Sequence, residues 1–230
     1  MIYVTGDMHG EQERFSDSKL KKLKRGDYLI VCGDFGFVWD GSAAERAFIR
    51  KLSKKKFTTL FVDGAHENFS ILDSYEVSKW NGGKVHLISD KVIHLMRGQI
   101  YQIEDQTIFT MGGGVSTDID MRFENDMWSE REIPSHAELV EGVDNLEKFD
   151  AAVDLVITHE PPAKLKEFMT LKDTGEVGIT GLNTYLEEMS GVCSFSHWYF
   201  GSLHIDKYID KTHSCVFKNI VNAKTGQKVE

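Results

Sequence analysis

Five short apolar runs recur along the chain, and each ends in glycine, threonine or aspartate followed by further polar residues. They occupy residues 2–4, 28–32, 58–62, 155–157 and 198–200. Near-continuous hydrophobicity of this length is typical of strands buried on both faces of a sheet. Helix-period segments over 11–24 and 43–52 separate the first three runs, which predicts parallel strands joined by right-handed crossovers. Polar residues then gather at the carboxyl ends of the strands, where open α/β sheets bind ligands.

The middle of the chain has a different pattern. Residues 84–111 alternate between apolar and polar positions, which indicates antiparallel strands. The turns of this stretch are expected near 89–90, 97–98 and 104–105. Helical periodicity returns over 135–148 and 180–189, so two kinds of sheet and several helices predict a mixed, layered α/β fold. Only three prolines and no linker-like stretch interrupt the 230 residues, and we expect one domain over 1–230.

Composition excludes several classes of protein. Lys+Arg 27 against Asp+Glu 36 gives a net charge of −9, which disfavours a binder of long nucleic acids but allows a small phosphate-bearing substrate. No apolar run approaches the roughly 20 residues that span a bilayer, and the first residues do not resemble a signal peptide, so we expect no membrane partner. Three cysteines without CxxC spacing indicate neither a disulfide framework nor a zinc ribbon. The expected location is therefore cytoplasmic, and the sequence does not indicate an oligomeric state.

Carboxylates follow the first two predicted strands. Asp7 and His9 lie in Gly6-Asp7-Met8-His9-Gly10, and in an extended backbone they project the same way, so that the pair can hold one cation. Asp34 follows the second strand. Adjacent parallel strands lie about 5 Å apart, which brings Asp34 beside Asp7, and two carboxylates that close repel each other unless a cation lies between them. A metal site is the prediction, although an ordinary Asx turn could explain either motif alone.

Histidines follow the other three predicted strands. They are His66 after Gly64-Ala65, His159 after Thr158, and His204 after Gly201-Ser202-Leu203. A single histidine at a strand end is more often a surface or turn residue than a ligand. Four histidines and two aspartates at one predicted sheet edge favour a metal centre instead.

Together these five blocks resemble the calcineurin-like metallophosphoesterase superfamily, in particular its small stand-alone enzymes of bacteria and phages. The superfamily is marked by GDxHG, GDxxxR-like, GNH(E/D), an isolated His after a strand, and GHxH, and the blocks here span Gly6 to His204 in that order. The resemblance implies a four-layer α/β/β/α sandwich of two facing mixed β-sheets flanked by helices. It also implies a hydrolase of phosphate mono- or diesters, acting on a small phosphoester or nucleotide. The second block lacks the arginine of many protein phosphatases, which disfavours that activity.

The resemblance further implies roles for individual residues. The metal ligands would be Asp7, His9 and His204 for a first divalent ion, His159 for a second, and Asp34 for both. His66 matches a histidine that does not bind metal, and it would act as the catalytic acid that protonates the leaving group. The two ions would activate a water for attack on phosphorus, and these ligands suit Mn, Fe, Zn or Ni alike.

Two positions depart from the family pattern, and both affect the second ion. Ala65 stands where the pattern has a ligating asparagine, and Ser202 stands where it has the first histidine of GHxH. We therefore predict a weakly occupied second site and an impaired enzyme. The chain could be an engineered knock-down, a natural enzyme with substitute ligands, or a mononuclear or inactive relative that binds a phosphorylated ligand without turnover. The substitute ligands considered are Glu160, Asn68 and His197.

Several other residues have no clear role in the pattern. The polar stretch 112–134 is typical of a solvated loop; the alternative is a cap over the site in which Arg122 binds the substrate phosphate. Three tryptophans, Trp39, Trp80 and Trp128, are expected in the core or at its rim, and the sequence does not select one that could stack on a base. A Rossmann-type nucleotide domain is disfavoured because GxGxxG is missing after the first strand.

Overall fold

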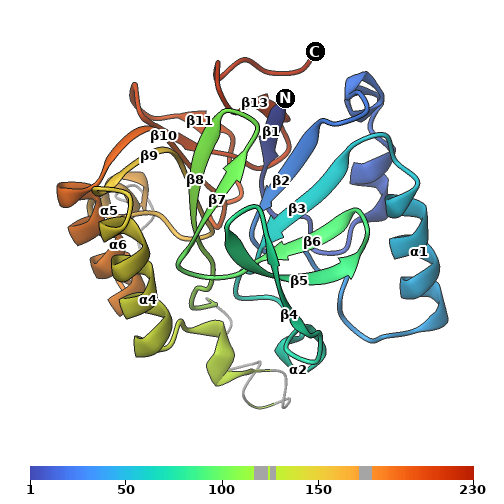
Figure 1. Cartoon of the computed structure of the whole chain (residues 1–230), viewed down its shortest axis with the longest axis horizontal. Helices are drawn as coiled ribbons and strands as arrows, with labels where there is room; N and C mark the ends of the chain where they lie inside the picture. Colours follow the sequence, from blue (N-terminus) through green and yellow to red (C-terminus); the bar gives the residue numbers. More distant parts are fainter. Residues whose placement is uncertain (117–123, 125–127, 171–177) are drawn as a thin grey trace.

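Two facing β-sheets form the centre of the computed structural model, which describes residues 1–116, 124, 128–170 and 178–230 (Figure 1). Within these residues the first sheet contains β1 (Ile2–Thr5), β2 (Tyr28–Cys32), β3 (Thr58–Val62), β4 (Val77–Trp80), β5 (Gly83–Ser89), β6 (Val92–Leu95) and β13 (Val221–Asn222). The second contains β7 (Gln99–Ile103), β8 (Gln106–Met111), β9 (Ala152–Thr158), β10 (Ser194–Phe200), β11 (Lys207–Tyr208) and β12 (His213–Cys215). The strand orders are β13-β1-β2-β3-β6-β5-β4 and β11-β12-β10-β9-β8-β7.

Both sheets are mixed. In the first sheet β1, β2, β3 and β6 are parallel, and in the second β8, β9, β10 and β12 are parallel. The strands added outside these groups pair in antiparallel fashion. The carboxyl ends of β1, β2 and β3 therefore lie at one edge, and those of β9 and β10 share an edge of the other sheet.

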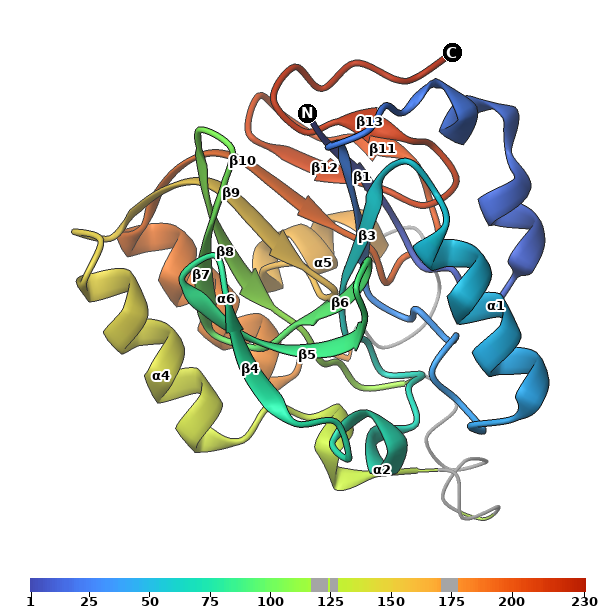
Figure 2. The same ribbon diagram turned by 45° about the vertical axis from the view of Figure 1, so that its right-hand side comes forward.

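Helices cover the outer faces of both sheets (Figure 2). On the first sheet these are α1 (Ala43–Ser53) and two 3-10 helices, η1 (Gln12–Ser16) and η2 (Ser18–Lys22). On the second they are α4 (His136–Glu147), α5 (Ala163–Thr170) and α6 (Gly181–Val192). Two short helices, α2 (Phe69–Leu72) and η3 (Glu130–Glu132), lie in connections. In the described part of the chain, no helix combines the length and apolarity that crossing a membrane demands.

Three apolar cores hold these layers together. Val4 and Ile30 belong to the core between the two sheets, whereas their neighbours Tyr3 and Leu29 belong to the core beneath α1. A third core packs α4 and α6 against the second sheet around Trp198. Successive side chains of a strand point to opposite faces, so burial on both faces produces the continuous apolar runs of the sequence. The expected four-layer sandwich is confirmed.

The alternating stretch 84–111 forms the predicted antiparallel strands but divides them between the sheets. β5 and β6 extend the first sheet, where β6 lies beside β3, and β7 and β8 extend the second, where β8 lies beside β9. The chain passes from one sheet to the other through residues 96–98. The turn expected near 97–98 is therefore a crossing between layers.

One predicted helix is wrong. The segment 11–24 forms η1 and η2 instead of a single α-helix. Asp17 lies between them with an extended ψ of 134°, and its carboxylate accepts a hydrogen bond from the backbone N–H of Lys19 at 2.8 Å. An aspartate in this position competes with the helical hydrogen bonds and favours a new cap. The apolar residues Phe15 and Leu20 are nevertheless buried as the periodicity indicates.

Candidate metal centre

The strand-end residues singled out in the sequence converge on one place. Asp7 and His9 follow β1, and Asp34 follows β2, which is paired in parallel with β1 so that Thr5 lies opposite Val31. His204 follows β10 of the facing sheet. One ligand atom from each of Asp7, His9, Asp34 and His204 lies within 4.8 Å of the others. Two sheet edges thus bring two carboxylates and two imidazoles to a single point.

The exposed side of this cluster is formed by two imidazoles. His204 Nε2 lies 3.0 Å from Asp7 Oδ2 and 3.0 Å from His9 Nε2. His9 Nε2 lies 3.6 Å from Asp34 Oδ2. Burial lowers the pKa of His9, although Asp34 and Asp7 oppose that effect, so the ring favours the neutral form that binds metals. These nitrogens and oxygens point toward a common centre.

His159 lies on the buried side. Its Nδ1 is 3.6 Å from Asp7 Oδ1, and its Nε2 is 3.7 Å from Asp34 Oδ1. Burial would lower the pKa of His159, but the charges of Asp34 and Asp7 outweigh burial and raise it to about 10. Both carboxylates are almost completely buried. The pair therefore draws positive charge toward itself, which is the electrostatic environment of a cation site.

The two carboxylates stay ionised in spite of their burial. Burial alone would raise the pKa of Asp7, but the charge of His159 and hydrogen bonds from His159 and His204 lower it. Burial opposes ionisation of Asp34 as well, and the charge of His159 with the contacts of His66 holds its pKa far below the usual range. Two ionised carboxylates with imidazoles around them form a donor set that fits a divalent transition metal.

His66 contacts the cluster through Asp34. Its Nδ1 lies 2.9 Å from Asp34 Oδ2, and its backbone N–H donates to Asp34 Oδ1 at 2.8 Å. On the other side of the ring, Nε2 lies 3.2 Å from the Ser116 hydroxyl. The sequence pattern gave no indication of Ser116, because it follows a Gly-rich stretch without a strand signal. These contacts orient the ring with Nε2 directed away from Asp34.

The backbone is strained at several of the residues that follow the strand ends. His9, Asp34, Ser202 and His204 have φ of 45°, 42°, 64° and 51°. Non-glycine residues adopt this left-handed region at a cost, and such residues cluster at functional sites. Glycine also provides room: a Cβ on Gly201 would lie 2.1 Å from Asp7 Oδ1, and one on Gly33 would lie 2.0 Å from His159 Nδ1. Residues 33 and 201 must therefore be glycine, because a side chain at either position would collide with His159 or Asp7.

The C-terminal segment contacts the loop after β1, which carries Asp7 and His9. The Phe217 carbonyl accepts hydrogen bonds from the backbone N–H of Gly6 and the hydroxyl of Thr5, both at 3.0 Å, and from the Arg14 guanidinium. The Phe217 ring stacks on His204 at 5.0 Å. Next along the chain, β13 pairs with β1, and the two termini lie at the same end of the molecule (Figure 1).

The two altered positions differ in what surrounds them. Ala65 is buried and offers no donor atom. Ser202 donates its backbone N–H to Asp7 and its hydroxyl to Glu160 Oε1 at 3.0 Å. The other oxygen of Glu160 accepts from Lys166 at 2.8 Å and from Asn183 at 2.9 Å. A buried carboxylate that is already fixed therefore stands beside the position of the missing histidine.

Two of the three suggested substitute ligands are hydrogen-bonded to other partners. Asn68 caps α2 and donates its side-chain amide to the Trp39 carbonyl at 2.5 Å. His197 lies on β10, 2.9 Å from the Ser214 hydroxyl. Glu160, by contrast, accepts from the Ser202 hydroxyl, and the backbone N–H of Ser202 donates to Asp7 of the cluster. Arg122, suggested as a phosphate clamp, lies outside the described residues.

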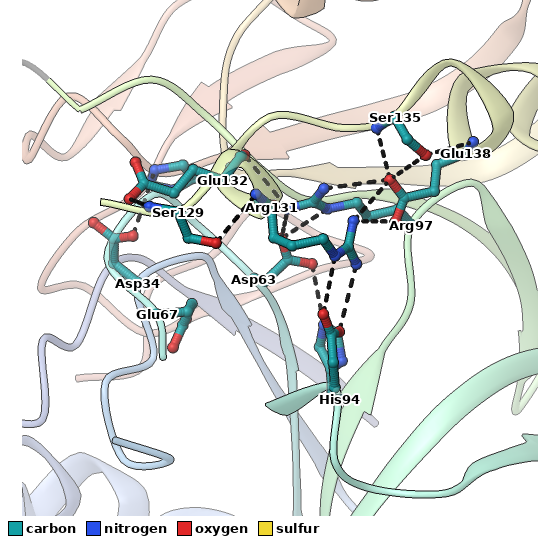
Figure 3. A network of polar contacts seen from close by, with 12 residues as sticks. Asp34, Asp63, Glu67, His94, Arg97, Ser129, Arg131, Glu132, Ser135 and Glu138 are labelled. Carbon is teal, nitrogen blue, oxygen red and sulfur yellow. Dashed lines mark hydrogen bonds and ion pairs between the residues drawn. The ribbon is translucent and has the colours of Figure 1, made fainter. Parts of the chain in front are cut away.

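A buried polar network adjoins the site (Figure 3). Asp63, at the end of β3, accepts from Arg97 Nε at 2.8 Å and lies 3.1 Å from His94 Nε2. Arg97 also contacts Glu138 of α4. This network links β3, the strand that precedes His66, to residues 96–98, where the chain crosses between the sheets.

Glu67, next to His66, is a second buried polar residue beside the site. Its carboxylate accepts the backbone N–H groups of Phe35 and Gly36, and burial together with the charge of Asp34 raises the pKa of Glu67 to about 8.

The network around Asp63 makes stability sensitive to acid. His86 Nδ1 lies 3.1 Å from His94 Nδ1, and burial lowers the pKa of His86 to about 4. In the unfolded chain His86 is protonated near pH 6.5. Between about pH 4 and pH 6.5 the folded state therefore binds fewer protons at this residue than the unfolded chain. We expect the contribution of His86 to the free energy of unfolding to fall as pH drops from about 6.5 to about 4 and to change no further below that. Below pH 4 the lowered pKa values of Asp7 and Asp34 make the total free energy of unfolding continue to fall. Denaturant unfolding of the wild type and His86→Gln at pH 7 and 4.5 measures this; an equal loss in both would contradict it.

Known proteins were compared with the chain by sequence and by structure. The sequence profile of the calcineurin-like phosphoesterases matches residues 1–213. Among solved structures, the crystal structure of phosphopantetheinyl hydrolase (PptH) from Mycobacterium tuberculosis has a TM-score of 0.44 and 14% sequence identity, covering 94% of this chain and 89% of that one. No curated protein matches the chain.

Proposed function

We propose that this chain, which belongs to the calcineurin-like phosphoesterase family, hydrolyses mono- or diesters of phosphate in small molecules with the aid of bound divalent metal. The observation that carries the proposal is the convergence of donor atoms from Asp7, His9, Asp34 and His204 within 4.8 Å. Three unpaired, buried cysteines suit a reducing compartment, and we place the reaction in the cytoplasm.

A first metal ion fits the residues present. Asp7, His9, Asp34 and His204 would hold it, and Mn, Fe, Zn and Ni all accept two carboxylates and two imidazoles. When bound, the metal supplies Lewis-acid polarisation of phosphoryl oxygens and lowers the pKa of water. The chain's own contribution is to keep both carboxylates ionised and buried, so that a cation, which in turn attracts the phosphate, is held at a fixed position.

His66 is the residue we assign to the leaving group. Asp34 contacts its Nδ1, which leaves Nε2 as the nitrogen able to donate a proton to the departing oxygen. The Ser116 hydroxyl lies 3.2 Å from this nitrogen, and an incoming ester oxygen would replace it as the hydrogen-bond partner of Nε2. Proton donation by a positioned imidazole typically contributes 10²–10⁴-fold to a rate.

A second ion does not fit a complete ligand set. Asp34 and His159 remain, Ala65 contributes no donor, and the Ser202 hydroxyl is bound to Glu160. We propose one tightly held ion, a weak second site and a correspondingly impaired enzyme. The alternative, a mononuclear relative that binds a phosphorylated ligand without turnover, is favoured by the same missing donors.

Metal titration and a substrate panel test this function together. We expect isothermal titration with Mn²⁺ to show one tight ion per chain and a second that binds on the order of 100-fold more weakly or worse, because even a lost partner outside the ligand shell typically costs 10–100-fold. Aryl phosphate mono- and diesters, assayed with Mn²⁺, Ni²⁺ or Zn²⁺, should be hydrolysed slowly but in a metal-dependent manner. Two fully occupied ions in anomalous scattering would refute the weak second site, and phosphate binding without turnover would establish the alternative.

A further inference from the structure

A pocket adjoins the metal cluster on the side of the proposed catalytic acid. It has a volume of about 510 Å³, and His9 and His66 form part of its lining together with Trp39 and the first turn of α1. This volume lies within the usual range of small-molecule sites. Because His66 would protonate the departing oxygen, the group bearing that oxygen must leave on this side. The pocket is therefore the place for the leaving group of the proposed reaction.

Trp39 is an exposed aromatic residue whose backbone is firmly held. The residue is 41% exposed, an unusual state for tryptophan. The Trp39 N–H donates to Glu45 of α1 at 2.7 Å, and its carbonyl accepts from Asn68 at 2.5 Å. Phe37 and Phe48 stack at 4.8 Å beneath the pocket. A fixed aromatic surface of this kind binds a planar ring without paying much ordering entropy.

The charges around the pocket restrict the occupant. Asp40 and Glu45 line it, and no lysine or arginine is among the described residues of its lining. A leaving group with a further phosphate would be repelled, which disfavours a polyphosphate. A neutral heteroaromatic ring with an N–H donor would instead complement Asp40, since both oxygens of Glu45 already accept backbone N–H groups of residues 39–41. Gln12 and Ser42 offer further polar contacts.

We propose that this pocket seats the base of a nucleoside, with Trp39 stacked on it, and that the substrate is a nucleoside phosphate ester bearing no second phosphate on the leaving side. The proposal rests on the function proposed above. In this proposal Trp39 selects the substrate, and cleavage takes place at the metal cluster.

A comparison of substrate preference tests the proposal. The four common nucleoside 5′-monophosphates and glycerol phosphate are assayed with Mn²⁺ for the wild type, Trp39→Ala, Trp39→Phe and the control Tyr208→Ala, which alters an exposed aromatic residue on β11. We expect the ratio of kcat/KM for the best nucleotide to that for glycerol phosphate to fall about tenfold in Trp39→Ala, as loss of one stacked base predicts. Trp39→Phe should retain most of the ratio, and Tyr208→Ala all of it.

Titration calorimetry of the same nucleotides and of inorganic phosphate separates this proposal from the function on which it rests. Hydrolysis without nucleotide preference, or with a ratio unchanged in Trp39→Ala, would overturn the pocket and leave the phosphoesterase intact. Nucleotide binding that depends on Trp39 but leads to no hydrolysis would support the pocket and overturn the enzyme. Absence of both would overturn the two proposals together.

Discussion

Asp34→Asn is expected to lower metal-dependent phosphoesterase activity by more than about a hundredfold, since even partners outside the ligand shell cost 10–100-fold. Asn preserves the shape of Asp34 and an oxygen that can accept from the His66 N–H, which lies 2.8 Å away. It removes the charge that would bind metal and that raises the pKa of His159. The measurements are kcat/KM on an aryl phosphate and the rise in melting temperature caused by Mn²⁺, which should vanish.

A surface carboxylate provides the control for this variant. Asp105 is exposed and pairs with Lys224 at 2.7 Å, and Asp105→Asn should leave both activity and metal-induced stabilisation as they are in the wild type. If Asp34→Asn still gains thermal stability from Mn²⁺ as the wild type does, Asp34 is not a ligand and the assignment fails.

Ala65→Asn combined with Ser202→His is expected to raise kcat for aryl phosphates on the order of a hundredfold and to bring the tightly bound ions from one to two per chain. Two ions stabilise the attacking and leaving oxygens together. The Glu160 carboxylate, now 3.0 Å from the Ser202 hydroxyl, is placed to orient an imidazole at residue 202. Metal-binding histidines usually donate their second N–H to such a group.

Matched variants show whether the gain comes from ligation. Ala65→Leu adds a side chain of similar size to asparagine but no donor oxygen, and it should give no increase in activity or ion stoichiometry. The two single substitutions should each give a smaller increase than the pair. If the double variant binds a second ion but hydrolyses no faster, the lost ligands are not what limits this chain.

The strands that carry the site could be predicted because their residues are buried on both faces. The runs 28–32 and 58–62 coincide with β2 and β3. Short edge strands such as β11, whose two residues are exposed, have no such signal. The break in the segment 11–24 could not be predicted, because hydrophobic periodicity indicates only which residues are buried. The two 3-10 helices η1 and η2 bury Phe15 and Leu20 just as one α-helix would. Local competition by Asp17 decided the backbone conformation.

The ligand candidates could be predicted for a similar reason, whereas their supports could not. Asp7, Asp34 and His204 come at strand ends, and parallel pairing brings strand ends together. Ser116 contacts His66, and Lys166 pairs with Glu160, but these contacts join residues whose separation in the sequence follows no strand or helix pattern. The selection of Trp39 among the tryptophans likewise required knowing which indole borders a cavity.

The match to the family ends at residue 213, but residues beyond it still support the loop after β1 that carries Asp7 and His9. Phe217 lies beyond that limit, and its carbonyl and ring hold Gly6 and His204. A shortened protein cut at the family boundary would lose this brace and also β13, leaving the backbone of β1 as an open edge that invites self-association. Trimming guided by homology alone is therefore expected to weaken the candidate metal site and to lower solubility at once, through residues that lie outside the candidate ligand set.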